Sequence, residues 1–253
     1  MTNLARFSQK YPRYQFSSQF YTSINDLDSV ISFFNYYDSL FKVPDLGCQL
    51  ISIFHNEDGA EVGTEISAVE PGMSVRVSAR ELGIQARGMV AVIAVPDQDI
   101  GSFKNISFDI KDRVTTGFYM DFYDGDRLVD TMHEWEPVDF ISPRERVVYV
   151  GIKYNDRVSE SGLVFTCPTM FDGDPGTILF KLKNELGICV GSAKIKGLES
   201  MTTCCVSYSE LFDNFGRVLV ESSILIVEVI GRLASDPLTY ERHVSGDFHV
   251  HHI

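Results

Sequence analysis

Four of the six histidines, His243, His249, His251 and His252, lie within the last eleven residues of the sequence. If this stretch is extended, alternate residues share a face, so His249 and His251 project to the same side. Two imidazoles at that spacing can bind a divalent transition metal when His243 or the distant His133 supplies a further ligand. The same pattern is also compatible with a polar terminal tail that binds no metal.

A second group of reactive side chains occupies the segment 117–137, where aromatic and acidic residues alternate. Tyr119, Asp121, Tyr123 and Trp135 are the candidate ligand-binding residues, because aromatic faces beside carboxylates suit a sugar ring or a cation. The alternative needs no ligand, since aromatic residues favour strands and acidic residues favour turns.

Two hypotheses about function from different classes follow from these groups. The first is a non-catalytic scaffold with an acidic, aromatic surface that binds a small molecule, a glycan or a protein. The second is a metal-dependent enzyme in which the histidines hold a divalent transition metal and Glu134 acts as general base on a metal-bound water. The sequence contains no GxSxG, GxGxxG, P-loop, HExxH or CxxC motif, which favours the first hypothesis.

The overall charge narrows the range of partners. The 253 residues carry a formal net charge of −13, and 44% of them are hydrophobic. A strongly acidic chain without a basic patch is not expected to bind nucleic acid. The apolar runs are shorter than the roughly 18–20 residues that a membrane-spanning helix requires, so no membrane partner is expected.

The cysteines and the first residues predict a cytoplasmic protein. Cysteine occurs an odd number of times, five, and without a CxxC pair, which is typical of free thiols in a reducing compartment. The first twelve residues lack the continuous apolar stretch of a signal peptide.

The spacing of apolar residues, which predicts the helices and strands that position these side chains, changes along the sequence. Within 25–41, apolar residues recur at intervals of three and four, which predicts an amphipathic helix with Asn25 as its N-cap and an end before Pro44. From Cys48 onward, short β-branched runs alternate with Gly, Pro and Asp clusters. This spacing predicts an all-β protein built from sandwiches or a barrel.

The order of the predicted strands indicates an internal repeat. Three copies begin with a strand that turns at Gly59, Gly125 or Gly187, and the segments 77–82 and 206–211 resemble each other. We therefore predict a pseudo-threefold array of β-sandwich or hairpin repeats. Its parts are a helical segment at 1–45, repeats at 46–101, 102–172 and 173–234, and a histidine-rich C-terminal tail at 235–253.

Hairpins also leave strand edges that a protein must protect. Closure of the sheet, acidic residues or association of subunits can each do this. A homo-oligomer is therefore an open expectation, although a net charge of −13 opposes close association.

Overall fold

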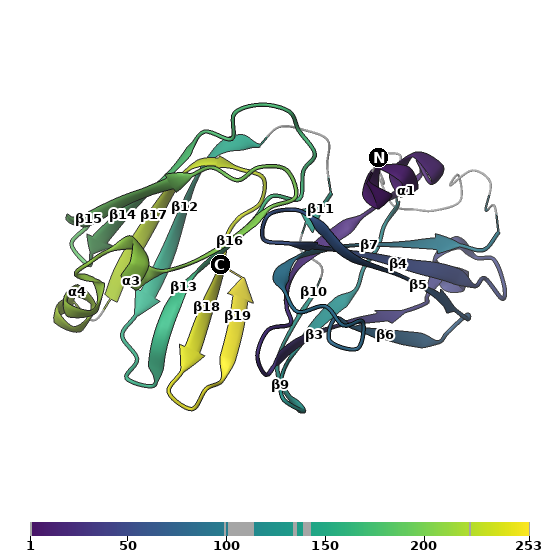
Figure 1. The fold of residues 1–253 in the computed structure, drawn as a ribbon, viewed down its shortest axis with the longest axis horizontal. Coiled ribbons are helices and arrows are strands. Elements are labelled where there is room, and N and C mark those ends of the chain that lie inside the picture. Colours follow the sequence, from purple (N-terminus) through teal and green to yellow (C-terminus); the bar gives the residue numbers. More distant parts are fainter. Residues whose placement is uncertain are drawn as a thin grey trace. The chain divides into compact units, whose positions relative to one another are not determined.

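The computed structural model describes residues 2–98, 100, 114–133, 136–138, 143–222 and 224–252. The chain divides into two compact units, Met1–Val138 and Asp139–Ile253. Both consist mainly of antiparallel β-sheet, so the predicted all-β class is confirmed (Figure 1). No helix in the described part of the chain is long and apolar enough to cross a membrane.

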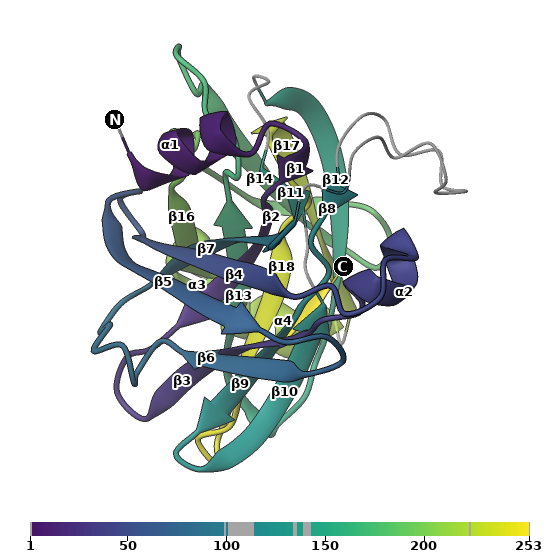
Figure 2. The ribbon, with the colours of Figure 1, turned by 90° about the vertical axis from the view of Figure 1, so that its right-hand side faces the viewer.

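The first unit contains two larger β-sheets and one two-stranded sheet. Its elements are α1 (Asn3–Lys10), β1 (Tyr14–Gln15), β2 (Ser17–Thr22), β3 (Leu27–Phe34), α2 (Tyr37–Phe41), β4 (Cys48–Asn56), β5 (Glu61–Val69), β6 (Ser74–Ser78), β7 (Arg87–Pro96), β8 (Val114–Thr115), β9 (Tyr119–Asp124), β10 (Arg127–His133) and β11 (Glu136–Pro137). One sheet has the order β11-β2-β7-β4-β5 and the other β10-β9-β3-β6 (Figure 2). The short β1 and β8 pair with each other in parallel.

The second unit is also built from two sheets. Its elements are β12 (Arg144–Lys153), β13 (Val158–Thr166), β14 (Thr177–Asn184), β15 (Cys189–Lys196), β16 (Thr203–Ser207), α3 (Tyr208–Leu211), α4 (Phe215–Ser222), β17 (Ile224–Leu233), β18 (Leu238–His243) and β19 (Phe248–His252). The sheets have the orders β12-β17-β14-β15 and β16-β13-β18-β19. The histidine-rich segment at 235–253 contains the hairpin β18–β19 at one edge of a sheet.

The two units share one strand order. Numbering β2 to β7, β9 and β10 as strands one to eight gives 1-6-3-4 and 8-7-2-5 in the first unit. Numbering β12 to β19 in the same way gives the same two orders in the second unit. The described strands therefore repeat twice, with one copy in each compact unit.

The hairpin between the third and fourth strands shows how close the correspondence is. In β4–β5, the Asn56 side chain accepts a hydrogen bond from the Ala60 amide at 2.9 Å, and in β14–β15 Asn184 accepts one from Ile188 at 3.0 Å. Each turn has a glycine with positive φ, Gly59 at 78° and Gly187 at 75°. Glycine adopts this left-handed conformation without the strain that a Cβ would bring.

The segments 77–82 and 206–211, which resemble each other in sequence, occupy the same place after the fifth strand. The Ser78 hydroxyl accepts a hydrogen bond from the Glu81 amide at 3.0 Å, and Ser207 accepts one from Glu210 at 3.1 Å. Serine in this position satisfies an amide that otherwise has no partner at the start of a helical turn.

The threefold repeat is not confirmed. Gly59 and Gly187 lie in equivalent hairpins, whereas Gly125 lies between β9 and β10, the seventh and eighth strands. The predicted second repeat, 102–172, includes the boundary between the two compact units. Hairpins look alike in sequence wherever they occur in a sheet, which explains why three copies were predicted where the strand order has two.

The predicted helix at 25–41 is wrong. Residues 27–34 form β3, which pairs with β6 on one side and β9 on the other. Both faces of this inner strand are largely buried, so its apolar residues do not alternate strictly with polar ones. Asn25 has a φ of 56° in the turn before β3 and caps no helix. Within 25–41, only Tyr37–Phe41 is helical.

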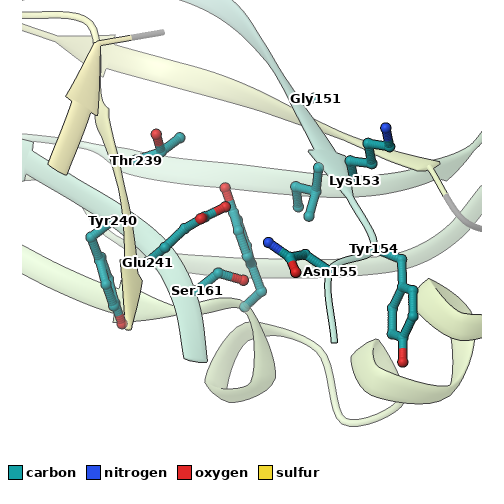
Figure 3. Close-up of a pocket in the computed structure, with 10 residues that line it drawn as sticks. Gly151, Lys153, Tyr154, Asn155, Ser161, Thr239, Tyr240 and Glu241 are labelled. Carbon is teal, nitrogen blue, oxygen red and sulfur yellow. The ribbon is translucent and has the colours of Figure 1, made fainter. Parts of the chain in front are cut away.

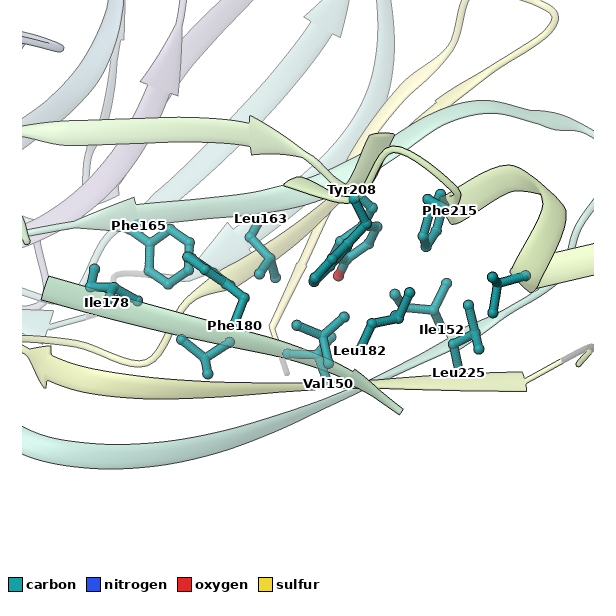
Figure 4. Packing of buried hydrophobic residues seen from close by; sticks show 14 of the residues in the cluster. Val150, Ile152, Leu163, Phe165, Ile178, Phe180, Leu182, Tyr208, Phe215 and Leu225 are labelled. Atoms are coloured by element: carbon teal, nitrogen blue, oxygen red, sulfur yellow. The ribbon is translucent and has the colours of Figure 1, made fainter. Parts of the chain in front are cut away.

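Each unit has its own buried apolar residues. In the second unit, Val150 and Ile152 of β12 pack with Phe165, Phe180 and other buried side chains (Figure 4). These positions follow the period of two that strands impose, with alternate residues directed into the space between the sheets.

Candidate functional site

The outer face of the sheet β10-β9-β3-β6 carries three of the predicted ligand-binding residues. Met120 and Phe122 of β9 are buried between the sheets, so Tyr119, Asp121 and Tyr123 lie on the opposite face. The Tyr119 side chain is 59% exposed. Alternation along β9 therefore brings these three residues to one open surface.

Small residues make this surface concave. On β3, Ser32 pairs with Tyr119 of β9 and with Arg76 of β6, while Phe34 pairs with Ser74. All five lie on the outer face, and together with neighbouring residues they line a hollow of about 650 Å³. The Phe34 side chain is 51% exposed. Ser32 and Ser74 have short side chains, whereas Tyr119, Phe34 and Arg76 have longer ones that reach further from the sheet.

Hydrogen bonds fix Asp121 in this surface. Its carboxylate accepts from the Ser32 hydroxyl at 2.7 Å and from the Thr131 hydroxyl at 2.8 Å, and Arg76 Nη2 lies 3.8 Å away. These contacts join β3, β6, β9 and β10. Asp121 therefore orders the surface in addition to contributing its charge.

Arg76 is a residue of this surface that the sequence did not single out. Its guanidinium lies 5.4 Å from the centre of the Tyr123 ring and donates to the Tyr123 hydroxyl at 2.5 Å. A cation already covers this ring, which disfavours a cationic ligand at Tyr123. Alternation within β6 could have placed Arg76 on an outer face, but the sequence does not reveal that β6 lies in the same sheet as β9.

A second hollow of about 530 Å³ adjoins Arg76 and includes Tyr123 and Asp28. The buried Asp28 carboxylate accepts from the Ser78 hydroxyl at 2.7 Å and from the Arg80 amide at 3.0 Å. Because its oxygens are occupied by the protein, Asp28 holds the turn after β6 in place.

The remaining residues of the predicted 117–137 site divide into two groups. Trp135 and Glu134 lie outside the described residues. His133 ends β10, and its carbonyl accepts from the Gln19 side chain at 2.7 Å.

The C-terminal histidines lie on the β18–β19 hairpin. His249 is opposite Glu241 and His251 is opposite Thr239, so both imidazoles lie on one face. The ring centres of His243 and His249 are 4.9 Å apart, and those of His249 and His251 are 6.0 Å apart. His243 Nε2 lies 3.5 Å from the Glu241 carboxylate.

Within the residues that the structure describes, no three His, Cys, Asp or Glu side chains are arranged to hold a metal ion. His133 belongs to the first unit, whereas His243, His249 and His251 belong to the second. The metal site and the role of Glu134 as general base therefore stay predictions.

Comparison with known proteins identifies no family for this chain. No protein-family model matches the chain, and no curated protein matches it. Among solved structures, a β-glucuronidase from glycoside hydrolase family 2 is similar at 10% sequence identity and a TM-score of 0.19. The match covers 94% of this chain and 24% of that structure's chain. A similarity at this level carries no argument about function.

Proposed function

We propose that this protein is a non-catalytic binding protein whose first unit binds a saccharide on the outer face of β9, β3 and β6. The observation that carries the proposal is the concave surface in which Ser32 adjoins the exposed rings of Tyr119 and Phe34, and Ser74 lies opposite Phe34. Two exposed aromatic rings beside serine hydroxyls have the composition of a binding site for a ring with an apolar face and hydroxyl edges.

The charges of the surface favour a saccharide over an organic cation. Arg76 is 57% exposed at its side chain and can donate hydrogen bonds to ligand hydroxyl or carboxyl groups. Asp121 shares its oxygens with Ser32 and Thr131, so it offers less to an incoming cation than a carboxylate without partners would. The ligand thus meets donors and aromatic faces.

A glycan array screened with the full chain tests the proposal. We expect binding to at least one saccharide, with affinity reduced about tenfold or more in Tyr119→Ala and in Phe34→Ala, because each removes one stacking face. Ile66→Ala is the matched control, since Ile66 is an exposed apolar residue on the other sheet of the same unit. Unchanged binding in both aromatic variants would refute the assignment of the surface.

We also propose that the protein works in the cytoplasm, because all five cysteines are free thiols. Strands β6 and β10 are the edges of their sheet, and edge strands can pair with another subunit. Association into a homo-oligomer is therefore a second proposal. Light scattering of the full chain measures the mass in solution, and a value near 28.5 kDa would contradict a homo-oligomer.

A further inference from the structure

The second unit contains a cavity of about 380 Å³ at one end of its two sheets. Its lining comes from the end of β12, from β13 and β18, and from α3 (Figure 3). The polar side chains that matter for the argument are Ser161, Thr239, Glu241 and Tyr208. This cavity is separate from the saccharide surface of the first unit and does not rest on that proposal.

Strand pairing places these polar residues in two rows on one face. Ser161 of β13 is opposite Glu241 of β18, which is opposite His249 of β19. In the next row, Leu163 is opposite Thr239, which is opposite His251. Leu163 belongs to the buried cluster between the sheets, so both rows are on the inner face of their sheet.

The equivalent positions of the first unit are apolar. Val30 pairs with Ser78 as Gly162 pairs with Ser207, which aligns Ser29 with Ser161. Phe122, opposite Ser29, therefore corresponds to Glu241, and Met120 corresponds to Thr239. Phe122 and Met120 are both buried, with Phe122 only 1% exposed.

The end of the first unit is also closed by hydrogen bonds that the described residues of the second unit do not make. Ser29 Oγ accepts from the Thr22 amide and donates to the Thr22 carbonyl, each at 2.9 Å. The hydroxyl of Ser161 makes no hydrogen bond among the described residues. A β-bulge between Val158 and Glu160 interrupts the register of β13 at this same end. Bulges bend a strand, which helps the sheets to separate here.

Tyr208 gives the strongest indication that the cavity binds a ligand. It follows Ser207 as Ala79 follows Ser78, so a phenol stands where the first unit has a methyl group. Tyr208 is 2% exposed, and its hydroxyl has no hydrogen-bond partner in the described part of the chain. Burial and the nearby Glu241 raise the pKa of this phenol, so it stays a proton donor. A buried donor without a partner is costly, and a bound acceptor would remove that cost.

We infer that this cavity binds a small hydroxylated amine, with the ammonium group at the Glu241 carboxylate and a ligand oxygen accepting from Tyr208. Among the described residues that line the cavity, Glu241 is the only one with a carboxylate. In Figure 3 the ammonium of Lys153 points away from Ser161 and Glu241. The imidazole of His243 lies 3.5 Å from the Glu241 carboxylate and carries a positive charge only when it is protonated, so the ligand's ammonium group would share this carboxylate with it. The hydroxyl of Ser161 is placed to bind a further oxygen of the ligand, and the hydroxyl of Thr239, which donates to the His251 carbonyl at 3.5 Å, can accept from another.

A titration of the ¹⁵N-labelled full chain with glucamine and with sorbitol tests this assignment. The two molecules differ only in one group, an amine in glucamine and a hydroxyl in sorbitol. We expect glucamine to shift the amide signals of Gly151, Ser161 and Thr239, with a dissociation constant at least about tenfold lower than that of sorbitol. Shifts confined to residues of the first unit would refute this site and leave the saccharide surface untouched.

Variants assign the two polar contacts. Glu241→Gln should remove the preference for glucamine, and Tyr208→Phe should weaken both ligands about threefold to tenfold because one hydrogen bond is lost. Tyr208→Phe should not lower the melting temperature, since the hydroxyl has no bond to lose. The matched control is Tyr149→Phe, because that hydroxyl already donates to Glu228 at 3.0 Å elsewhere in the same unit.

Three results would overturn the inference. They are the absence of glucamine binding, equal affinity for glucamine and sorbitol, and a preference for glucamine that survives in Glu241→Gln. If Glu241→Gln does not fold, an unchanged affinity in Tyr208→Phe is sufficient to refute the site.

Discussion

The two units have the same strand order, but one end of the sheets is closed in the first unit and open in the second. In the first unit, Phe122 and Met120 fill the space between the sheets and Ser29 bonds to Thr22 across the end. In the second, Glu241 and Thr239 occupy the corresponding positions beside a cavity. The topology decides where such a space lies, and a few inward side chains decide whether it is closed.

The two units also differ in where their hollows lie. The first unit has a closed end and a concave outer face with exposed aromatic rings, whereas the second has an open, polar end. A shared scaffold can therefore carry unlike sites, which is why the strand order alone says nothing about ligands.

The largest expected effect comes from placing a glutamate, which the second unit has at Glu241, at the equivalent position of the first unit, Phe122. Phe122→Glu should lower the free energy of unfolding of the first unit by more than about 4 kcal/mol, because it removes a packed ring and buries a carboxylate without a partner. Urea denaturation followed by tyrosine fluorescence measures this change. A loss below about 1 kcal/mol would show that the end of the first unit is not closed in solution.

A smaller effect should distinguish Ser29 from Ser161, which occupy equivalent positions in the two units. Ser29→Ala should cost about 1–3 kcal/mol, since it leaves the buried Thr22 amide without its acceptor. Ser161→Ala should change the free energy of unfolding by less than about 0.5 kcal/mol, because no hydrogen bond of the described structure is lost. Equal losses in the two variants would contradict the difference between the ends.

Closing the open end is the reverse experiment. The double variant Thr239→Met, Glu241→Phe introduces the residues of the first unit and should raise the free energy of unfolding by about 1–2 kcal/mol through apolar burial. It should also abolish the glucamine-induced shifts. Retained glucamine binding would argue that the ligand lies elsewhere. A destabilised but folded variant would show that the second unit cannot accommodate the larger residues.

The smallest effect is a dependence on pH in the first unit. Burial lowers the pKa of His55 from its ordinary 6.5, and the neighbouring Glu61 only partly opposes this. The unfolded chain then binds a proton more readily than the folded one, so stability falls as the pH drops below about 6.5. His55→Gln should reduce this dependence in urea denaturation between pH 7 and pH 5.

The equivalent of His55 in the second unit provides the contrast. Lys183 occupies that position and pairs with Glu228 at 3.0 Å. This position should therefore contribute no loss of stability to the second unit over the same range of pH. Hydrogen exchange, resolved by unit, separates the two contributions.

Local features of the fold could be predicted from the sequence. The strands predicted from Cys48 onward begin with β4 at that same residue, and the alternation in 117–123 separates buried Met120 from exposed Tyr119. The period of two is a local property, so it remains visible without any knowledge of the partner strands.

Features that depend on distant pairing could not be predicted. Arg76 reaches the surface of Tyr119 only because β6 and β9 both pair with β3, and Tyr208 joins Glu241 only through the arrangement of the second unit. The helix predicted at 25–41 was wrong for the same reason, because a strand with partners on both sides is buried on both faces and loses its alternation.

The repeated strand order has a consequence for synthesis on the ribosome. Two neighbouring units with the same order could exchange equivalent strands while the second is still emerging, a common misfolding route in tandem proteins. Every pairing that the structure describes joins strands of a single unit. The unlike inner faces discourage exchange, since β18 in place of β9 would bring Glu241 into an apolar core. The residues that distinguish the two ends therefore also help each unit to fold with its own strands.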